Sequence, residues 1–175
     1  MRRITSIATT LIAAIGVVAP VCADGTPQLA GKYVLDATAS DNIETVIETA
    51  TAPMNFVYRM GARAVLKKRH TAYAKLQIAH DAQEIVVTLA DGNPMRMPID
   101  GTTAKWTRED GDVLVIKGQL QGQALTQTLW TSDTKRINDF SLDTTGGTLT
   151  LKVQFTSQQL EKPMLYQLVY RRDAL

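Results

Sequence analysis

The chain of 175 residues is 45% hydrophobic and 21% charged, and its formal net charge is +2. Two of its 19 basic residues, Arg2 and Arg3, precede an apolar N-terminal run, and without them the chain would hold 17 basic and 17 acidic residues. A neutral mature chain argues against nucleic acid as a partner. No linker divides residues 24–175, a length that suits one domain with a full core.

The N-terminus has the features of a secretory signal. An apolar run, Ile7 to Ala19, follows the two arginines, and the residues Val21-Cys22-Ala23 stand where a signal peptidase reads the chain. We therefore predict a signal peptide at 1–23, one domain at 24–175, and a periplasmic or secreted mature protein. A transmembrane anchor is the alternative, but the apolar run is shorter than the roughly 20 residues that span a bilayer.

Cys22 is the only cysteine of the chain. It could be the lipidated residue of a bacterial lipoprotein, but Val21 is β-branched where such sites carry Gly, Ala or Ser. Cleavage after Ala23 would remove this cysteine, and the mature chain would then have no disulfide, no thiol nucleophile and no thiolate metal ligand.

One strand and one amphipathic helix are predicted first. The strand runs from Lys32 to Asp36, and Ser40 or Asp41 can cap the helix that follows. The apolar residues of this helix recur at helical spacing and define its packing side: Ile43, Val46, Ile47 and Ala50.

A second helix, with Pro53 in its first turn, lies in a segment without acidic residues between Glu48 and Asp81. We predict that Val57, Gly61, Ala64 and Val65 form its packing side. On another side, Arg59, Arg63 and Lys67 recur every four residues. These three could form an ordinary solvated face. Alternatively, they could lie on a lid at a barrel mouth and attract an anionic amphiphile or an anionic membrane surface.

From Thr71 onward apolar and polar residues alternate, and turn formers interrupt the pattern. The clearest strand places Leu149, Leu151, Val153 and Phe155 on one face. We predict about nine strands after the helices and one before them. Closure removes exposed edges, so the expected fold is mainly β, an antiparallel up-and-down barrel of about 8 to 10 strands with an N-terminal helix-turn-helix lid. A two-sheet sandwich is the alternative, but it would need long crossings.

This order of elements resembles the fatty-acid-binding proteins of the calycin superfamily. The segment Gly31 to Tyr33 is similar to the Gly-x-Trp of calycins, and Arg171 or Arg172 to the late arginine that packs across that aromatic ring. Another resemblance is to secreted bacterial lipocalin-like proteins, through residues spread over the second half of the chain: Trp106, Gly111, Leu114, Pro163, Tyr166, Tyr170 and Arg172. Both resemblances imply the barrel, and the first implies that the helix pair lids it.

Several polar side chains are candidates for binding a ligand. Arg136 and Asn138 share a strand face with Phe140 and Leu142, so they would point inward and offer a charge-assisted hydrogen bond to a ligand head group. Alternatively, Arg136 lies at the barrel rim in water. Two tyrosines, Tyr166 and Tyr170, could line the cavity or pack as core.

Catalytic and metal signals are weak. His70 and His80 are predicted to be solvated at strand ends, and no metal site or cofactor is expected. No phosphate loop or Gly-x-Ser-x-Gly motif is present, so nothing nominates an enzyme.

The leading hypothesis is a lipocalin-like module for a small apolar or amphipathic ligand, which an interior void of several hundred cubic ångströms would favour. A non-catalytic envelope interaction protein would instead have a filled barrel and an exposed apolar patch. The third hypothesis, a lipid-modifying barrel enzyme, would require a buried titratable group with a perturbed pKa.

Overall fold

The computed structural model describes residues 28–173, and the predicted signal peptide lies outside the described residues. One strand precedes two helices and nine strands follow them, as predicted. In chain order the elements are β1 (Gly31–Leu35), α1 (Ile43–Thr51), α2 (Phe56–Arg69), β2 (Lys75–His80), β3 (Glu84–Leu89), β4 (Met95–Pro98), β5 (Ala104–Thr107), β6 (Val113–Gln121), β7 (Ala124–Trp130), β8 (Thr134–Leu142), β9 (Thr148–Ser157) and β10 (Met164–Arg172).

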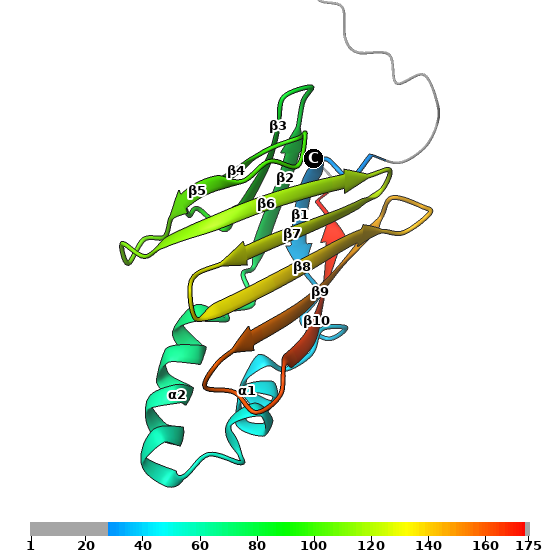
Figure 1. Ribbon diagram of the computed structural model, residues 1–175. Coiled ribbons are helices and arrows are strands. Elements are labelled where there is room, and N and C mark those ends of the chain that lie inside the picture. Colours follow the sequence, from blue (N-terminus) through cyan, green and yellow to red (C-terminus); the bar gives the residue numbers. More distant parts are fainter. Residues whose placement is uncertain (1–27, 174–175) are drawn as a thin grey trace, which may run out of the picture.

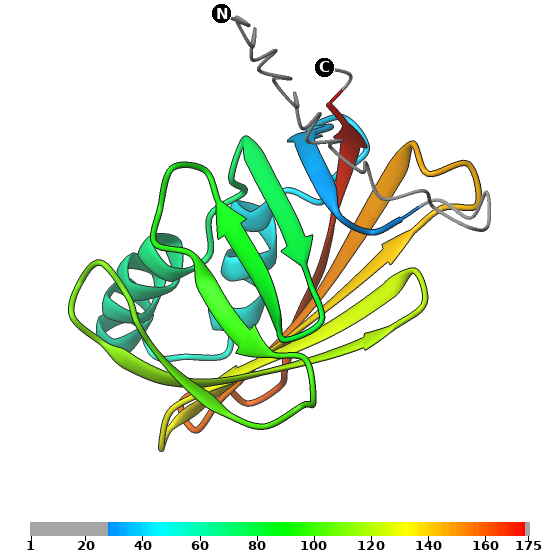
Figure 2. The ribbon, with the colours of Figure 1, turned by 90° about the horizontal axis from the view of Figure 1, so that it is seen from above.

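The ten strands form one antiparallel sheet in the order β4-β3-β2-β1-β10-β9-β8-β7-β6-β5. The two end strands, β4 and β5, approach each other without pairing, so the sheet curves into a nearly closed barrel (Figure 2). The first strand, β1, pairs with both β2 and β10, and every other pair joins consecutive strands. The chain therefore needs no long crossing between two sheets. The predicted mainly β barrel is confirmed.

Alternation along the strands fills the barrel interior. Leu149, Leu151, Val153 and Phe155 of β9 are buried, as predicted, while Lys152 and Gln154 between them are exposed. The polar side chain of Gln127 is also fully buried, with an exposed fraction of 0%. Side chains therefore fill most of the barrel interior, and some of these side chains are polar.

The predicted contact between a late arginine and the aromatic residue of β1 is confirmed for Arg172. Its guanidinium carbon lies 5.0 Å from the centre of the Tyr33 ring, and its Nη2 donates a hydrogen bond of 2.9 Å to the Tyr33 hydroxyl. Arg171 instead pairs with Asp36 on the outside. The first and last strands are thus joined by side chains as well as by their ladder.

The first helix packs as predicted, but its cap differs. Asn42, rather than Ser40 or Asp41, accepts hydrogen bonds from the backbone N–H groups of Glu44 and Thr45. The other two residues bind the backbone of β10: Asp41 accepts a hydrogen bond of 2.7 Å from the N–H of Gln167, and Ser40 accepts one from β10 as well. These bonds attach the start of α1 to the last strand.

The orientation of α2 is the reverse of the predicted one. Val57 and Val65, expected to pack, are 76% and 48% exposed, whereas Arg59 and Arg63 are half-buried. The basic side of α2 faces α1, since Arg63 and Lys67 both contact residues of that helix. The helix packs more against α1 than against the barrel. The helix also begins at Phe56 with Asn55 as its cap, so Pro53 lies in the loop between the helices. Both helices lie at one end of the barrel (Figure 1).

Candidate functional site

A small cavity of about 100 Å³ lies inside the barrel at the end covered by the helices. Its apolar wall comes from strands on opposite sides of the barrel, including Leu89, Leu114, Leu129 and Phe155. Its polar wall combines the end of α2 with β5 and β8. A water molecule occupies roughly 30 Å³ in the liquid, so this space suits only a small chemical group.

Arg136 is the central cation of the cavity wall. Its Nε donates a hydrogen bond of 2.8 Å to Oδ1 of Asn138, whose Nδ2 donates one of 2.8 Å to Oε1 of Gln127. Gln127 in turn donates to the sulfur atoms of Met95 and Met97, 3.4 and 3.6 Å away. Thioethers are weak acceptors. The chain of amides therefore positions Arg136 without neutralising its charge.

No carboxylate forms an ion pair with Arg136 within residues 28–173. The other arginines near the cavity differ in this respect. Arg69 pairs with Asp112 at 3.0 Å, and Arg108 lies 3.7 Å from both Asp110 and Asp112. A half-buried guanidinium without a counterion is unfavourable unless an anion can reach it. Arg136 is thus the best placed group for binding a ligand anion.

His70 lies in the same wall and is buried, so the prediction of a solvated histidine is wrong at this position. It ends α2, and its ring packs edge-on against Phe155 with centroids 4.5 Å apart. Its Nδ1 is 3.1 Å from the hydroxyl of Tyr166, and its Nε2 is buried with no hydrogen-bond partner among residues 28–173. Burial, with the nearby cations Arg136, Arg108 and Arg69, lowers the pKa of His70 to about 3.

A histidine with this pKa is neutral at physiological pH and is a weak base. An efficient general base has a pKa near the working pH. The geometry therefore makes His70 a neutral hydrogen-bonding group facing the cavity. Burial likewise raises the pKa of Tyr166, so its hydroxyl stays protonated. Within the described chain, no group of three or more His, Cys, Asp or Glu side chains could hold a metal ion.

Two buried N–H donors also line this wall without a partner in the described chain. Trp106 Nε1 and one terminal nitrogen of Arg108 are buried and make no hydrogen bond within the described part of the chain. The Arg108 nitrogen is within ion-pairing range of its carboxylates but too far for a hydrogen bond. Trp106, Arg108 and His70 all line the same cavity as Arg136. Unsatisfied buried donors that gather around one space indicate a place for an acceptor.

A larger groove of about 590 Å³ lies between α2 and the turns at the barrel rim. Arg69, Arg108, Thr134 and Phe155 line both the groove and the cavity, so the two spaces adjoin. The groove also has apolar side chains from α2 and the β9–β10 loop, among them Val65, Leu66 and Leu160. The arrangement is a polar pocket that opens into a partly apolar groove.

The structure brings together three of the predicted site residues. Arg136 and Asn138 line the cavity, and Tyr166 reaches it through its contact with His70. Tyr170 is buried in the core and does not line the cavity. The inward direction of Arg136 is therefore correct, and the alternative of a fully solvated rim position is not adopted.

The basic residues of α2 lie elsewhere. Arg59 donates to the carbonyl oxygens of Ala52 and Met54, Arg63 donates to the hydroxyl of Thr51, and Lys67 pairs with Glu44. All three tie α2 to α1 or to the loop between them, and a role for them in ligand binding stays a prediction.

Sequence reasoning missed Arg69, Arg108 and the cavity-facing roles of His70 and Trp106. Trp106 lies in β5 and Arg108 directly follows that strand, so period two, continued by one residue, places both on one face once Ala104 is assigned inward. The alternation could therefore have found them. The burial of His70 could not be found in this way, because it depends on how the end of α2 meets β9 and β10.

The element order, the strand pairing and the helix pair at one end give the chain the same fold as solved fatty-acid-binding proteins. Solved structures with this fold include a REP1-NXSQ fatty acid transporter, which is 18% identical over 84% of this chain and 97% of that chain, with a TM-score of 0.54. Fatty-acid-binding protein 1 of Echinococcus granulosus is 10% identical, covers 83% and 97%, and has a TM-score of 0.52.

A secretary abundant heat soluble (SAHS) protein from Ramazzottius varieornatus is 10% identical over 85% of this chain and 98% of that chain, with a TM-score of 0.58. No protein-family model and no curated protein matches the sequence. At these identities the likenesses establish the fold.

Proposed function

We propose that this protein is a secreted or periplasmic lipocalin-like module that binds a small amphipathic anion. The acidic head group binds Arg136 and the unsatisfied donors beside it, and the apolar part lies in the groove under α2. The signal peptide predicted from the sequence at 1–23 supports this location. The observation that carries the proposal is the half-buried Arg136, which within residues 28–173 has no carboxylate partner and lies in a cavity with unsatisfied donors.

The volumes constrain the ligand. The inner cavity of about 100 Å³ is below the roughly 300 to 1,000 Å³ of most ligand pockets, whereas the groove of about 590 Å³ is within that range. A carboxylate or similar group fits the cavity, but a whole lipid does not. The named neighbours include a fatty acid transporter and a fatty-acid-binding protein, which supports a fatty anion as the first ligand to test.

Calorimetric titration with dodecanoate and with dodecanol, its uncharged analogue, tests the head-group site. We expect the acid to bind more tightly than the alcohol, and Arg136→Gln to weaken acid binding about 10- to 100-fold, because hydrogen bonds to charged groups are the stronger ones. Arg96→Gln is the matched control, since Arg96 pairs with Glu84 outside the barrel. Equal binding of acid and alcohol would reject the proposal, as would an unaffected Arg136→Gln variant.

The groove is tested independently through Gly61, which lines it and has open space around the position that a side chain would take, with no atom within 4 Å of an added Cβ. Gly61→Phe would add a large side chain at the wall of the groove, starting from a Cβ position that has room. The variant should weaken binding of dodecanoate but not that of butyrate, whose short chain stays near the cavity. Equal weakening of both acids would show that the apolar part does not lie in the groove.

A second candidate function rests on the exposed side of α2. Phe56, Val57, Tyr58 and Met60 are each at least 60% exposed. A filled barrel with an exposed apolar patch is what an envelope interaction protein would have. The partner proposed for this patch is an anionic membrane surface, and the exposed Lys68 lies further along the same helix. Neither described helix is long and apolar enough to cross a membrane.

Flotation with anionic vesicles tests this second candidate. A Val57→Ser/Met60→Ser variant should lose most of the vesicle binding of the wild type, because exposed apolar side chains supply the burial on the lipid surface. Leu165→Ser is the control, since Leu165 is an exposed apolar residue on β10. If the wild type does not float with the vesicles, the membrane is not the partner of α2.

A further inference from the structure

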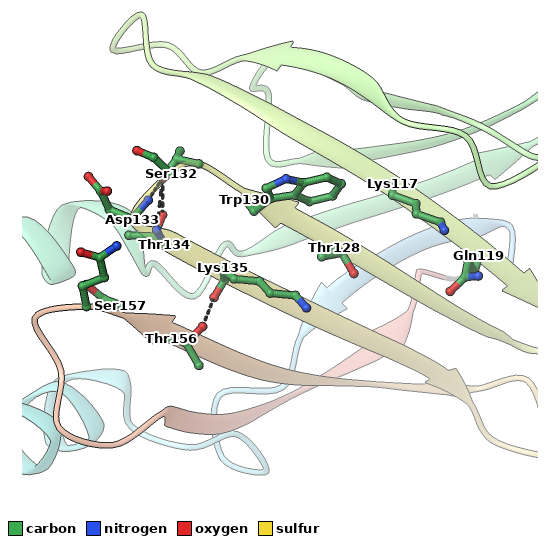
Figure 3. A pocket seen from close by; sticks show the side chains of 12 residues that line it. Lys117, Gln119, Thr128, Trp130, Ser132, Asp133, Thr134, Lys135, Thr156 and Ser157 are labelled. Carbon is green, nitrogen blue, oxygen red and sulfur yellow. Dashed lines mark hydrogen bonds between the residues drawn. The ribbon is translucent and has the colours of Figure 1, made fainter.

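A second groove lies on the outer face of the barrel, away from the cavity. It has a volume of about 700 Å³, and side chains of β6 to β9 and the β7–β8 turn line it. Figure 3 shows Trp130 in this groove with Lys117 and Lys135 near it. None of its residues except Thr134 also lines the inner cavity. The outer groove adjoins the groove under α2, because residues 131–134, Ser157 and Gln158 line both. Lys117, Trp130 and Lys135 line neither the groove under α2 nor the inner cavity, and they define the separate part of this surface.

Strand register explains how the groove is built. Trp130 on β7 is paired with Lys135 on β8, which is paired with Thr156 on β9. Two residues before Trp130 on β7, Thr128 lies on the same face and is paired with Lys117 on β6. Directly paired side chains on one face have Cβ atoms about 5 Å apart. The short threonines therefore form the floor, and the longer tryptophan and lysines rise beside it.

The groove has uncompensated positive charge. Within residues 28–173, neither Lys117 nor Lys135 forms an ion pair, although exposed lysines elsewhere on the chain do, as Lys67 and Lys68 show. Asp133 is the single acidic residue among those that line the groove, and it lies at the turn. A ligand for this surface therefore carries negative charge.

Three features together identify the chemical class of the ligand. The half-buried indole of Trp130 offers a flat apolar surface, which suits the C–H face of a pyranose ring. Hydroxyl and amide groups of Thr128, Thr156 and Gln119 suit the hydroxyl groups of a sugar. The two lysines suit an acidic substituent. We propose that this outer groove binds an anionic saccharide, a sugar ring bearing a carboxylate or a phosphate.

The two tryptophans of the chain allow a direct test. Trp130 lies in the outer groove and Trp106 lines the inner cavity, so their indole N–H signals in NMR spectra distinguish the two sites. The probes are a uronic acid tetrasaccharide, a neutral tetrasaccharide, glucose 6-phosphate and inorganic phosphate. We expect the acidic tetrasaccharide or the sugar phosphate to shift the Trp130 signal and leave that of Trp106 in place. Which acidic probe binds more tightly tells the carboxylate from the phosphate.

Two variants and one control test the residues. Lys117→Gln/Lys135→Gln should weaken binding of the better acidic probe about tenfold or more, and Trp130→Leu about fivefold. Lys32→Gln/Lys152→Gln removes the same charge from exposed positions outside the groove and should leave binding unchanged. Equal binding of neutral sugar or of inorganic phosphate would overturn the proposal. So would equal loss in the control, or the absence of any shift at millimolar concentrations.

Discussion

Replacement of Arg172 by alanine should lower the free energy of unfolding by about 2 to 4 kcal/mol. The guanidinium group donates to the carbonyl oxygens of Ala30 and Gly146, at 3.0 and 2.7 Å, and to the hydroxyl of Tyr33. It also covers the ring of Tyr33, which is 1% exposed. Removal leaves several acceptors without a donor where β1 meets β10. Urea unfolding followed by fluorescence measures the loss.

Arg171→Ala is the neighbouring control, because Arg171 makes one exposed ion pair with Asp36, a contact worth at most about 1 kcal/mol. Lysine at position 172 should recover only part of the loss, because it keeps the charge but not the planar set of donors. Similar stability of the two alanine variants would contradict the proposed role of Arg172.

The position of the Arg172 side chain over Tyr33 also explains the glycine at position 31. A methyl group at Gly31 would lie 2.3 Å from Nη1 of Arg172, so Gly31→Ala must displace the guanidinium group. The two substitutions should therefore be strongly non-additive, with Gly31→Ala costing little once Arg172 is alanine. Additive losses would show that the glycine acts independently of the arginine.

The stability of the protein should fall as the pH drops from about 7 to about 5, with a slope approaching 1.4 kcal/mol per pH unit below the ordinary histidine pKa. Folding lowers the pKa of His70 from 6.5 to about 3. Between these values the unfolded chain binds a proton that the folded chain excludes. Acidification therefore favours unfolding, and the stabilisation present above pH 6.5 is lost progressively toward pH 3.

His70→Gln should remove this slope, because glutamine keeps a polar side chain but does not titrate. His80→Gln is the matched control, since His80 is exposed at the end of β2. Unfolding in urea at several pH values between about 7 and about 5 avoids most carboxylate titration. A flat profile for the wild type, or an unchanged slope in His70→Gln, would contradict the burial of a neutral histidine.

Much of the barrel could be predicted because its information is local. The alternation of Leu149, Leu151, Val153 and Phe155 with polar residues assigns one face of β9 to the interior. The same rule places Arg136 with Phe140 on the inner face of β8, and the structure agrees. Successive side chains of a strand point to opposite faces because of the backbone geometry, so the alternation does not depend on what the strand packs against. Short turns then leave neighbouring strands little choice of partner.

The size of the cavity could not be predicted in this way. Gln127 and Asn138 are polar residues on inward faces, and the sequence does not say that they would bond to each other and to the methionines of β4. Those contacts depend on strands that approach across the barrel. They fill much of the interior and leave only a small space beside Arg136.

The order of elements, the antiparallel barrel, the inward faces of the strands and the apolar side of α1 all follow from patterns within the chain. Which side of α2 is covered, and that His70 is buried, depend on packing between distant segments. Helical periodicity defines two sides of α2 but does not say which one meets a neighbour. Hydrogen bonds from Arg59 and Arg63 to α1 and its following loop turn the basic side inward, and the apolar side is left exposed. A helix that rests mainly on another helix has its orientation chosen by that partner, through contacts distant in sequence.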